Sequence, residues 1–167
     1  MKTISSIDKI NQLTKNDFID IFGNVFEKTY WIADKAYNFK PYKNFNELLF
    51  TIFKIYENSS RDDCLKIFNS HPELAIEKKL TKDSRNEQEN ANLNECSEEE
   101  FKEFKKLNEE YKKKFRFPFI ITVKGKNKEE ILNSFRQRIT NNINLEFEEA
   151  KEQVKKIANL RLNEIIK

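Results

Sequence analysis

The only histidine of the chain, His71, is the side chain best suited to move protons near neutral pH. It is followed at once by Pro72, in the stretch IFNSHPELA. Proline disfavours helical backbone at the residue before it, so the preceding helix should end near His71. A histidine at a helix C-terminus also interacts favourably with the helix dipole. Both roles, a proton carrier and a polar residue at a helix end, fit this position.

A second polar cluster, Ser84-Arg-Asn-Glu87-Gln88, has the pattern of a capping box. In such a box the Ser84 hydroxyl would accept a hydrogen bond from the amide of Glu87, and the Glu87 carboxylate would reach back to Ser84. The pattern is common in proteins. Taken alone, it predicts a helix that starts at Ser84.

Arg161 interrupts an apolar face of the last predicted helix. Arginine is seldom fully buried unless it is paired. Arg161 therefore either extends to the rim of the core or meets an anion where the core opens. Arg138, in the preceding helix, could be a similar case, although a structural role fits it better. The apolar face consists of Ala150, Val154, Ile157 and Ile165.

The composition indicates one soluble domain over residues 1–167, with 38% hydrophobic and 35% charged residues. The 31 basic and 28 acidic side chains leave a net charge of +3, which argues against a dedicated nucleic-acid-binding protein. The most basic run, Lys112–Lys114 with Arg116, lies next to Glu109 and Glu110. This run predicts a solvated helix face rather than a binding stripe.

Several other chemistries do not fit the residues present. Gly23 and Gly125 are the only glycines, so the chain has no glycine-rich phosphate loop. Cys64 and Cys96 lack metal-ligand spacing, and with a single histidine they predict two reduced thiols and no metal site. The first residues lack the apolar core of a signal peptide, and no apolar run is long enough to cross a membrane. These observations predict a cytoplasmic protein that does not bind a membrane.

The fold class predicted from these patterns is all-α: a single-domain multi-helix bundle with one short extended segment near 117–124. Glycine and proline are scarce, and apolar residues recur at helical spacing. Ser97 and the acidic residues after it indicate the start of one long helix. The predicted helices cover 16–27, 31–36, a stretch around 48–55, 60–69, 97–116, 127–140 and 143–166.

The exception is FPFIITVKG, residues 117–125, a β-branched apolar run between a proline and a glycine. It is too short for a helix and has no evident partner strand. Its backbone amides and carbonyls must still find hydrogen-bonding partners. A bound polar ligand could supply some of them.

Taken together, these stretches resemble the family of 2-oxo-4-hydroxy-4-carboxy-5-ureidoimidazoline (OHCU) decarboxylases of urate degradation. The resemblance covers nearly the whole chain and depends on the order and spacing of motifs that are weak singly. The matching stretches are GNVFEKTYWIADKA, KPY, His71-Pro-Glu-Leu-Ala75, Ser84 with Glu87 and Gln88, Ala91 and Leu93, FKKLNEEYKKKFRFPFIITVKG, RITN and KIANLRL.

The resemblance implies a cofactor-free, all-helical enzyme, commonly a homodimer, that converts OHCU to (S)-allantoin with release of carbon dioxide. It implies that His71 and Glu87 form the catalytic pair. It also implies a set of substrate contacts, namely Pro72, Ser84, Gln88, Arg161 and the backbone of 119–123, which comprises Phe119, Ile120, Ile121, Thr122 and Val123.

Two residues depart from the family pattern. Asn92 and Arg116 each stand where the family commonly has glycine. Both departures lie beside the predicted site and bear on loop geometry and substrate fit. They leave an alternative function open, a non-catalytic helical interaction module descended from the family.

Overall fold

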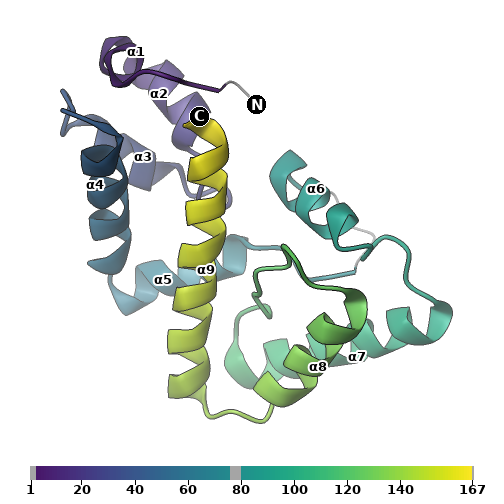
Figure 1. Ribbon diagram of the computed structural model, residues 1–167. Helices are drawn as coiled ribbons and strands as arrows, with labels where there is room; N and C mark the ends of the chain where they lie inside the picture. Colours follow the sequence, from purple (N-terminus) through teal and green to yellow (C-terminus); the bar gives the residue numbers. More distant parts are fainter. Residues whose placement is uncertain (1–2, 76–79, 167) are drawn as a thin grey trace. The chain divides into compact units, whose positions relative to one another are not determined.

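The computed structural model describes residues 3–75 and 80–166, and within these ranges the ordered elements are all helices, as the sequence predicts. Figure 1 shows them in chain order. No helix in the described ranges is both long enough and apolar enough to cross a membrane. The helices are α1 (Ile7–Gln12), α2 (Lys15–Phe22), α3 (Tyr30–Tyr37), α4 (Phe45–Glu57), α5 (Arg61–Ser70), α6 (Lys82–Asn90), α7 (Glu98–Phe115), α8 (Lys128–Arg138) and α9 (Ile143–Ile165).

The chain divides into two compact units. Unit 1 comprises residues 1–70 and 155–167, and unit 2 comprises residues 71–154, so α9 contributes its first half to unit 2 and its second half to unit 1. In unit 1, α3 packs against both α2 and α4 (Figure 1). Phe26 stacks on Tyr56 with ring centroids 4.8 Å apart, and Leu162 of α9 is fully buried. At the end of α9, the Ile165 carbonyl accepts a hydrogen bond from the amide of Ile4.

The helix predicted over 16–27 ends earlier than its apolar pattern suggests. Helix α2 stops at Phe22, and Gly23 is its C-cap. A methyl group at Gly23 would lie 2.5 Å from the Tyr30 ring, so a side chain there would clash with α3. Glu27 and Lys28 then adopt positive φ angles, which helical backbone excludes. The apolar residues after Gly23 therefore pack from a turn rather than from a helix.

The core of unit 2 is an aromatic cluster centred on Tyr111 of α7. The Tyr111 ring contacts Phe115, Phe117 and Phe119 at centroid distances between 4.5 and 5.9 Å. Phe119 in turn stacks on Phe135 of α8, with centroids 3.9 Å apart and ring planes 9° from parallel. Helices α7 and α8 lie side by side in this unit (Figure 1). The cluster fixes the segment after α7 against both helices.

Local capping signals set the ends of the helices in unit 2. Helix α7 begins with a capping box in which Ser97 and Glu100 bond to each other's backbone, as predicted for Ser97. Helix α8 begins in the same way with Asn127 and Glu130. Residues 118–123, between these helices, are neither helix nor turn. The segment predicted to interrupt the helices near 117–124 is therefore not helical, and its extended conformation stays a prediction.

Candidate functional site

His71 is a buried residue that directly follows α5, so the predicted helix end is confirmed. Leu74 and Ala75, shortly after it, are also buried, and Ala75 has a φ of +52°. A left-handed conformation is unfavourable for alanine, so the surrounding contacts must hold this turn in place. The segment from His71 to Ala75 is therefore a constrained turn within unit 2.

The capping box predicted at Ser84 is wrong, because α6 begins three residues earlier. Thr81 is the N-cap, and its hydroxyl accepts a hydrogen bond from the amide of Ser84. Ser84 is thus the third helical residue, and its side chain is buried. Glu87 lies one turn further on, inside the helix, so it does not cap the helix. Its side chain is half-buried. Capping therefore does not explain the glutamate at this position.

The side chain of Gln88 connects α6 to the turn that follows His71. Its Nε2 donates to the carbonyl of Glu73 at 3.2 Å, and its Oε1 accepts from the amide of Ala75 at 3.1 Å. A second amide side chain, Asn108 of α7, donates from Nδ2 to the carbonyl of Leu74 at 3.0 Å. The family resemblance implies that Gln88 contacts the substrate, and the structure shows its amide bonded to the turn. Asn108 was not predicted as a site residue.

The predicted substrate segment 119–123 is held along one side by two side chains. Nη1 of Arg138 donates to the carbonyl of Ile120 at 2.7 Å, and the Arg138 guanidinium lies 4.4 Å from the centroid of the Phe119 ring. The amide of Thr122 donates to Oε1 of Gln153 at 2.8 Å. The Thr122 hydroxyl is buried and has no hydrogen-bonding partner among the described residues.

Arg138 belongs to a buried polar network that centres on Glu146, whose exposed fraction is 0%. Nε and Nη2 of Arg138 donate to Oε1 of Glu146 at 2.8 and 2.5 Å. The same oxygen accepts from the Tyr111 hydroxyl, while Oε2 accepts from Asn141. Burial and, after it, the hydrogen bond to Glu146 raise the pKa of Tyr111, so its hydroxyl stays protonated and donates. Glu146 was missed because an acid in the first turn of a helix is expected for the dipole alone.

Arg161 lies in unit 1, and the anion that it meets there is a protein carboxylate. Its Nη1 lies 2.9 Å from Oε2 of Glu27 and donates to the carbonyl of Asn24 at 3.0 Å. The two charged side chains are only 3% and 1% exposed. Arg161 therefore does not extend to the rim of the core, and the anion that it meets is a buried carboxylate rather than one at an opening of the core. The role of Arg161 as a substrate contact stays a prediction.

The two residues that replace family glycines both have left-handed backbone. Asn92 has a φ of +57°, and Arg116, the C-cap of α7, has a φ of +67°. Glycine is the residue that adopts this conformation without steric cost, which explains the family preference. The chain therefore keeps the backbone conformation that the glycines favour.

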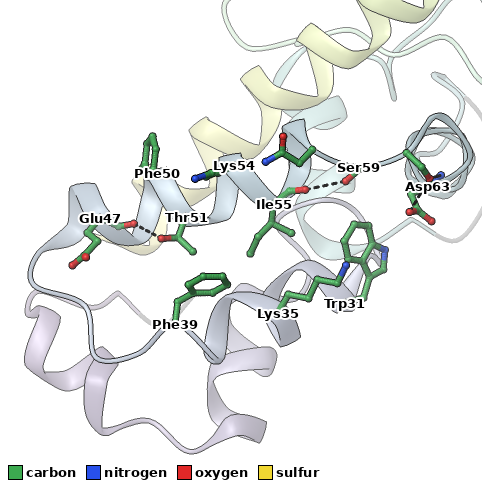
Figure 2. A pocket seen from close by; sticks show the side chains of 12 residues that line it. Trp31, Lys35, Phe39, Glu47, Phe50, Thr51, Lys54, Ile55, Ser59 and Asp63 are labelled. Atoms are coloured by element: carbon green, nitrogen blue, oxygen red, sulfur yellow. Dashed lines mark hydrogen bonds between the residues drawn. The ribbon is translucent and has the colours of Figure 1, made fainter.

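A hollow of about 530 Å³ lies in unit 1, on the faces of α3 and α4, and is drawn in Figure 2. Its lining includes two lysines, Lys35 and Lys54, and two carboxylates, Glu47 and Asp63, so the ionised side chains balance. Within the described residues, its lining contains none of the predicted site residues. The hollow is thus separate from the residues that the sequence singles out.

The chain is similar to several known proteins. The family model described as OHCU decarboxylase matches residues 11–163. A uric acid degradation bifunctional protein of Bacillus sp. strain TB-90 is 38% identical over 161 residues, covering 96% of this chain but only 32% of that protein. The 2-oxo-4-hydroxy-4-carboxy-5-ureidoimidazoline decarboxylase of Haloferax volcanii is 32% identical over 159 residues, covering 95% of each chain. This chain therefore spans about a third of the bifunctional relative and nearly all of the other.

Two solved structures have similar folds. An (S)-allantoin synthase superposes with a TM-score of 0.79 at 23% identity, covering 98% of this chain and 54% of that one. An OHCU decarboxylase, determined in the presence of (S)-allantoin, superposes with a TM-score of 0.69 at 27% identity, covering 83% of this chain and 92% of that one. The first likeness concerns the fold alone.

Proposed function

Because the chain belongs to the OHCU decarboxylase family, we propose that it is a carboxy-lyase that converts OHCU to (S)-allantoin and carbon dioxide in urate degradation. One observation carries this proposal: the family match runs from residue 11 to residue 163 and so includes every predicted site residue. The nearly full-length relative from Haloferax volcanii is named for the same reaction.

The substrate can serve as its own electron sink. The carbon that bears the carboxylate also bears a hydroxyl and adjoins a ring C=N bond. When the bond to the carboxylate breaks and carbon dioxide leaves, its electron pair forms a new C=C bond, and the C=N pair moves to the ring nitrogen, which takes a proton. The resulting enol then loses its hydroxyl proton and gains a proton on the neighbouring carbon, on one face only. The residues need only hold the substrate and move protons, which requires no cofactor.

His71 is the proton donor and acceptor in this proposal, and Glu87 assists it. Gln88 supports the pairing, because its side chain bonds to Glu73 and Ala75, in the turn that begins at His71. Consecutive Cα atoms are about 3.8 Å apart, so residues one or two positions before Gln88 and Glu73 have their backbone close to these hydrogen bonds. Glu87 precedes Gln88, and His71 precedes Glu73 by two positions. In this proposal the half-buried Glu87 carboxylate faces the buried His71 imidazole, orients it and stabilises its charged form.

The remaining predicted residues bind the substrate in this proposal. Pro72 and Ser84 lie on the two elements that carry the catalytic pair, and the Thr122 hydroxyl and the backbone of 119–123 offer hydrogen-bonding groups to the ureido and ring atoms. Arg161 can hold an anionic or carbonyl edge through its planar guanidinium. The test of this role is Arg161→Lys, which keeps the positive charge opposite Glu27 but loses the planar guanidinium and its paired N–H donors.

We propose in addition that residues 1–167 act as one family domain, since the family match includes residues of both units. The family resemblance supports a homodimer, and the composition supports a cytoplasmic location. Light scattering of the purified protein tests the homodimer: a mass of twice 20.1 kDa is expected, and a monomer at all concentrations would contradict it.

The test of the proposed reaction is a direct assay on freshly prepared OHCU. Ultraviolet absorbance follows the loss of substrate, and circular dichroism follows the handedness of the allantoin. Because OHCU decays spontaneously to racemic allantoin, the protein should accelerate the loss and produce an excess of the (S) enantiomer. A rate and a racemic product equal to those of the protein-free reaction would favour the non-catalytic interaction module instead.

A further inference from the structure

The turn between α2 and α3, residues 24–29, presents two acceptors to Arg161. Oε2 of Glu27 lies 2.9 Å from Nη1 of Arg161, and the same nitrogen donates to the carbonyl of Asn24 at 3.0 Å. Both charged side chains are almost fully buried, so they interact in an environment of low dielectric constant. One short turn therefore supplies both the counter-charge of this arginine and a neutral acceptor for it.

The backbone of this turn adopts an unfavourable conformation. Glu27 and Lys28 have φ angles of +39° and +53°, and left-handed backbone costs free energy in residues other than glycine. Asn24 holds both residues, because its carbonyl accepts from the amide of Glu27 at 3.1 Å and its Oδ1 accepts from the amide of Lys28 at 3.0 Å. The Thr29 hydroxyl donates to the carbonyl of Glu27 at 3.1 Å. Strained backbone of this kind is found where a group must be held in one place.

Aromatic packing anchors the same turn. Phe26, which precedes Glu27, is buried and stacks on Tyr56 of α4. Its ring also meets the Phe53 ring edge to face, with centroids 6.3 Å apart. These contacts do not involve Arg161, so the position of the Glu27 backbone is set independently of the guanidinium that its carboxylate meets.

Stability alone does not account for this arrangement. A buried ion pair gives little net stability, and apolar side chains of similar volume often replace it without loss. The left-handed turn adds a second cost to that of burying the charges. The buried pair of unit 2, Arg138 with Glu146, has no such cost, because both of its residues are helical. What the turn of unit 1 provides is a fixed orientation of the Arg161 guanidinium.

We propose that Glu27 is a positioning residue of the reaction: turn 24–29 fixes its carboxylate, and the carboxylate holds the Arg161 guanidinium in the orientation that binds the substrate. This inference rests on the proposed function and deepens it, because it adds a residue on which substrate binding by Arg161 depends. Glu27 acts through Arg161 and does not touch the substrate. A planar guanidinium binds a carboxylate or carbonyl edge in a defined geometry, so its orientation determines its affinity.

The kinetic test is Glu27→Gln, which keeps the shape of the side chain and removes its charge. An arginine that binds the ground state and the transition state alike affects KM rather than kcat. The variant should therefore raise KM for OHCU on the order of tenfold at nearly unchanged kcat, the effect of losing one charge-assisted hydrogen bond. Glu27→Asp keeps the charge and should raise KM less. An unchanged KM in Glu27→Gln, with only a lower melting temperature, would overturn the proposal.

Two controls separate positioning from a general loss of charge or stability in unit 1. Glu57→Gln removes the carboxylate that pairs with Lys155, a partly exposed cation of α9. Ile10→Ala creates a cavity at a fully buried position of α1 and should lower the melting temperature. Both controls should leave KM unaltered. A rise in KM in either control as large as that in Glu27→Gln would overturn the proposal.

A double variant tests whether Glu27 acts through Arg161. In an Arg161→Met background, adding Glu27→Gln should raise the melting temperature, because no carboxylate then remains buried without its cation. It should not raise KM further, since the group that Glu27 positions is already absent. If Glu27→Gln raised KM by the same factor with and without the guanidinium, the positioning role would be overturned.

Calorimetric titration with (S)-allantoin tests the same role without turnover. If Glu27→Gln binds (S)-allantoin about tenfold more weakly in a protein that does not convert OHCU, the proposed reaction fails and the positioning role stands. If OHCU is converted and Glu27→Gln leaves both KM and the Kd of (S)-allantoin unchanged, the positioning role fails alone. A raised KM with an unchanged Kd would support the role and assign the guanidinium to the carboxylate that the product lacks. Neither conversion nor binding by the unmodified protein would overturn both proposals.

Discussion

Unit 2 contains two irregular segments from the predicted site, and they are held in different ways. The turn from His71 to Ala75 is held by neutral amides, those of Gln88 and Asn108. Segment 119–123 is held by the charged side chain of Arg138 as well as by an amide. The first segment offers a side chain for proton transfer, and the second offers backbone groups for binding. The difference predicts that losing the charged contact costs more stability than losing an amide contact, since a buried ion leaves a larger penalty when its partner is lost.

Removing the charged contact should have the largest effect on stability. Arg138→Met would leave the fully buried Glu146 without its cation, so the free energy of unfolding should fall by about 3–5 kcal/mol. Urea denaturation measures this change. The double variant Arg138→Met with Glu146→Leu should recover part of the loss, because no charge then remains buried. A loss below about 1 kcal/mol for Arg138→Met would contradict the view that the charged contact holds its segment more strongly than the amides hold the turn.

Removing an amide contact should have an intermediate effect. Gln88→Leu leaves the carbonyl of Glu73 and the amide of Ala75 without their partner, which should cost about 1–3 kcal/mol. Gln137→Leu, at an exposed position, is the matched control and should change stability by less than about 0.5 kcal/mol. If Gln88→Leu abolishes turnover at normal stability, Gln88 contacts the substrate directly, as predicted from the sequence.

Restoring the family glycine before the second segment should be mildly favourable. Arg116 has a φ of +67°, which costs a non-glycine residue about 1–2 kcal/mol. Arg116→Gly should therefore raise the free energy of unfolding by about 0.5–1 kcal/mol, and Asn92→Gly should raise it less, because asparagine tolerates this conformation. Differential scanning calorimetry would show both increases in stability as higher melting temperatures. A lower melting temperature for Arg116→Gly would contradict the assigned strain.

The exposed ion pair between Glu103 of α7 and Arg136 of α8 should have the smallest effect. Arg136 bonds Glu103 in two places, and this hydrogen bond lowers the pKa of Glu103. A lowered pKa contributes stability above the unfolded value, about 4.3, and the contribution is lost as pH falls through the folded value. Because both side chains are over a third exposed, Arg136→Ala should lower stability only slightly at pH 7 and not at all in acid. Denaturation at pH 7 and pH 3 checks both the size and the sign.

The sequence predicts most helices because their apolar residues repeat at helical spacing, and it predicts α7 to within a residue because Ser97 is a strong cap. It fails where two local signals compete. Thr81 and Ser84 both resemble N-caps, and only the capping box favours Ser84, yet Thr81 caps α6. The short helix α1 was not predicted at all.

The partners of the site residues depend on tertiary packing. Arg138 was predicted to be structural and Arg161 to be functional. In the structure each is a buried arginine that bonds one carboxylate and one backbone carbonyl. Their partners, Glu146 and Glu27, give no sign in the sequence, because only folding brings them together. Sequence patterns can therefore identify a buried charge but not what it holds.

The central claim is that His71 moves the proton that decides the handedness of the product. The most direct measurement is the conversion of fresh OHCU by His71→Asn, followed by absorbance and circular dichroism beside the unmodified protein and Glu87→Gln. His71→Asn should fold normally and lose turnover by a factor on the order of 10²–10⁴, with Glu87→Gln impaired as well. Stereospecific formation of (S)-allantoin by His71→Asn at nearly the unmodified rate would contradict the account.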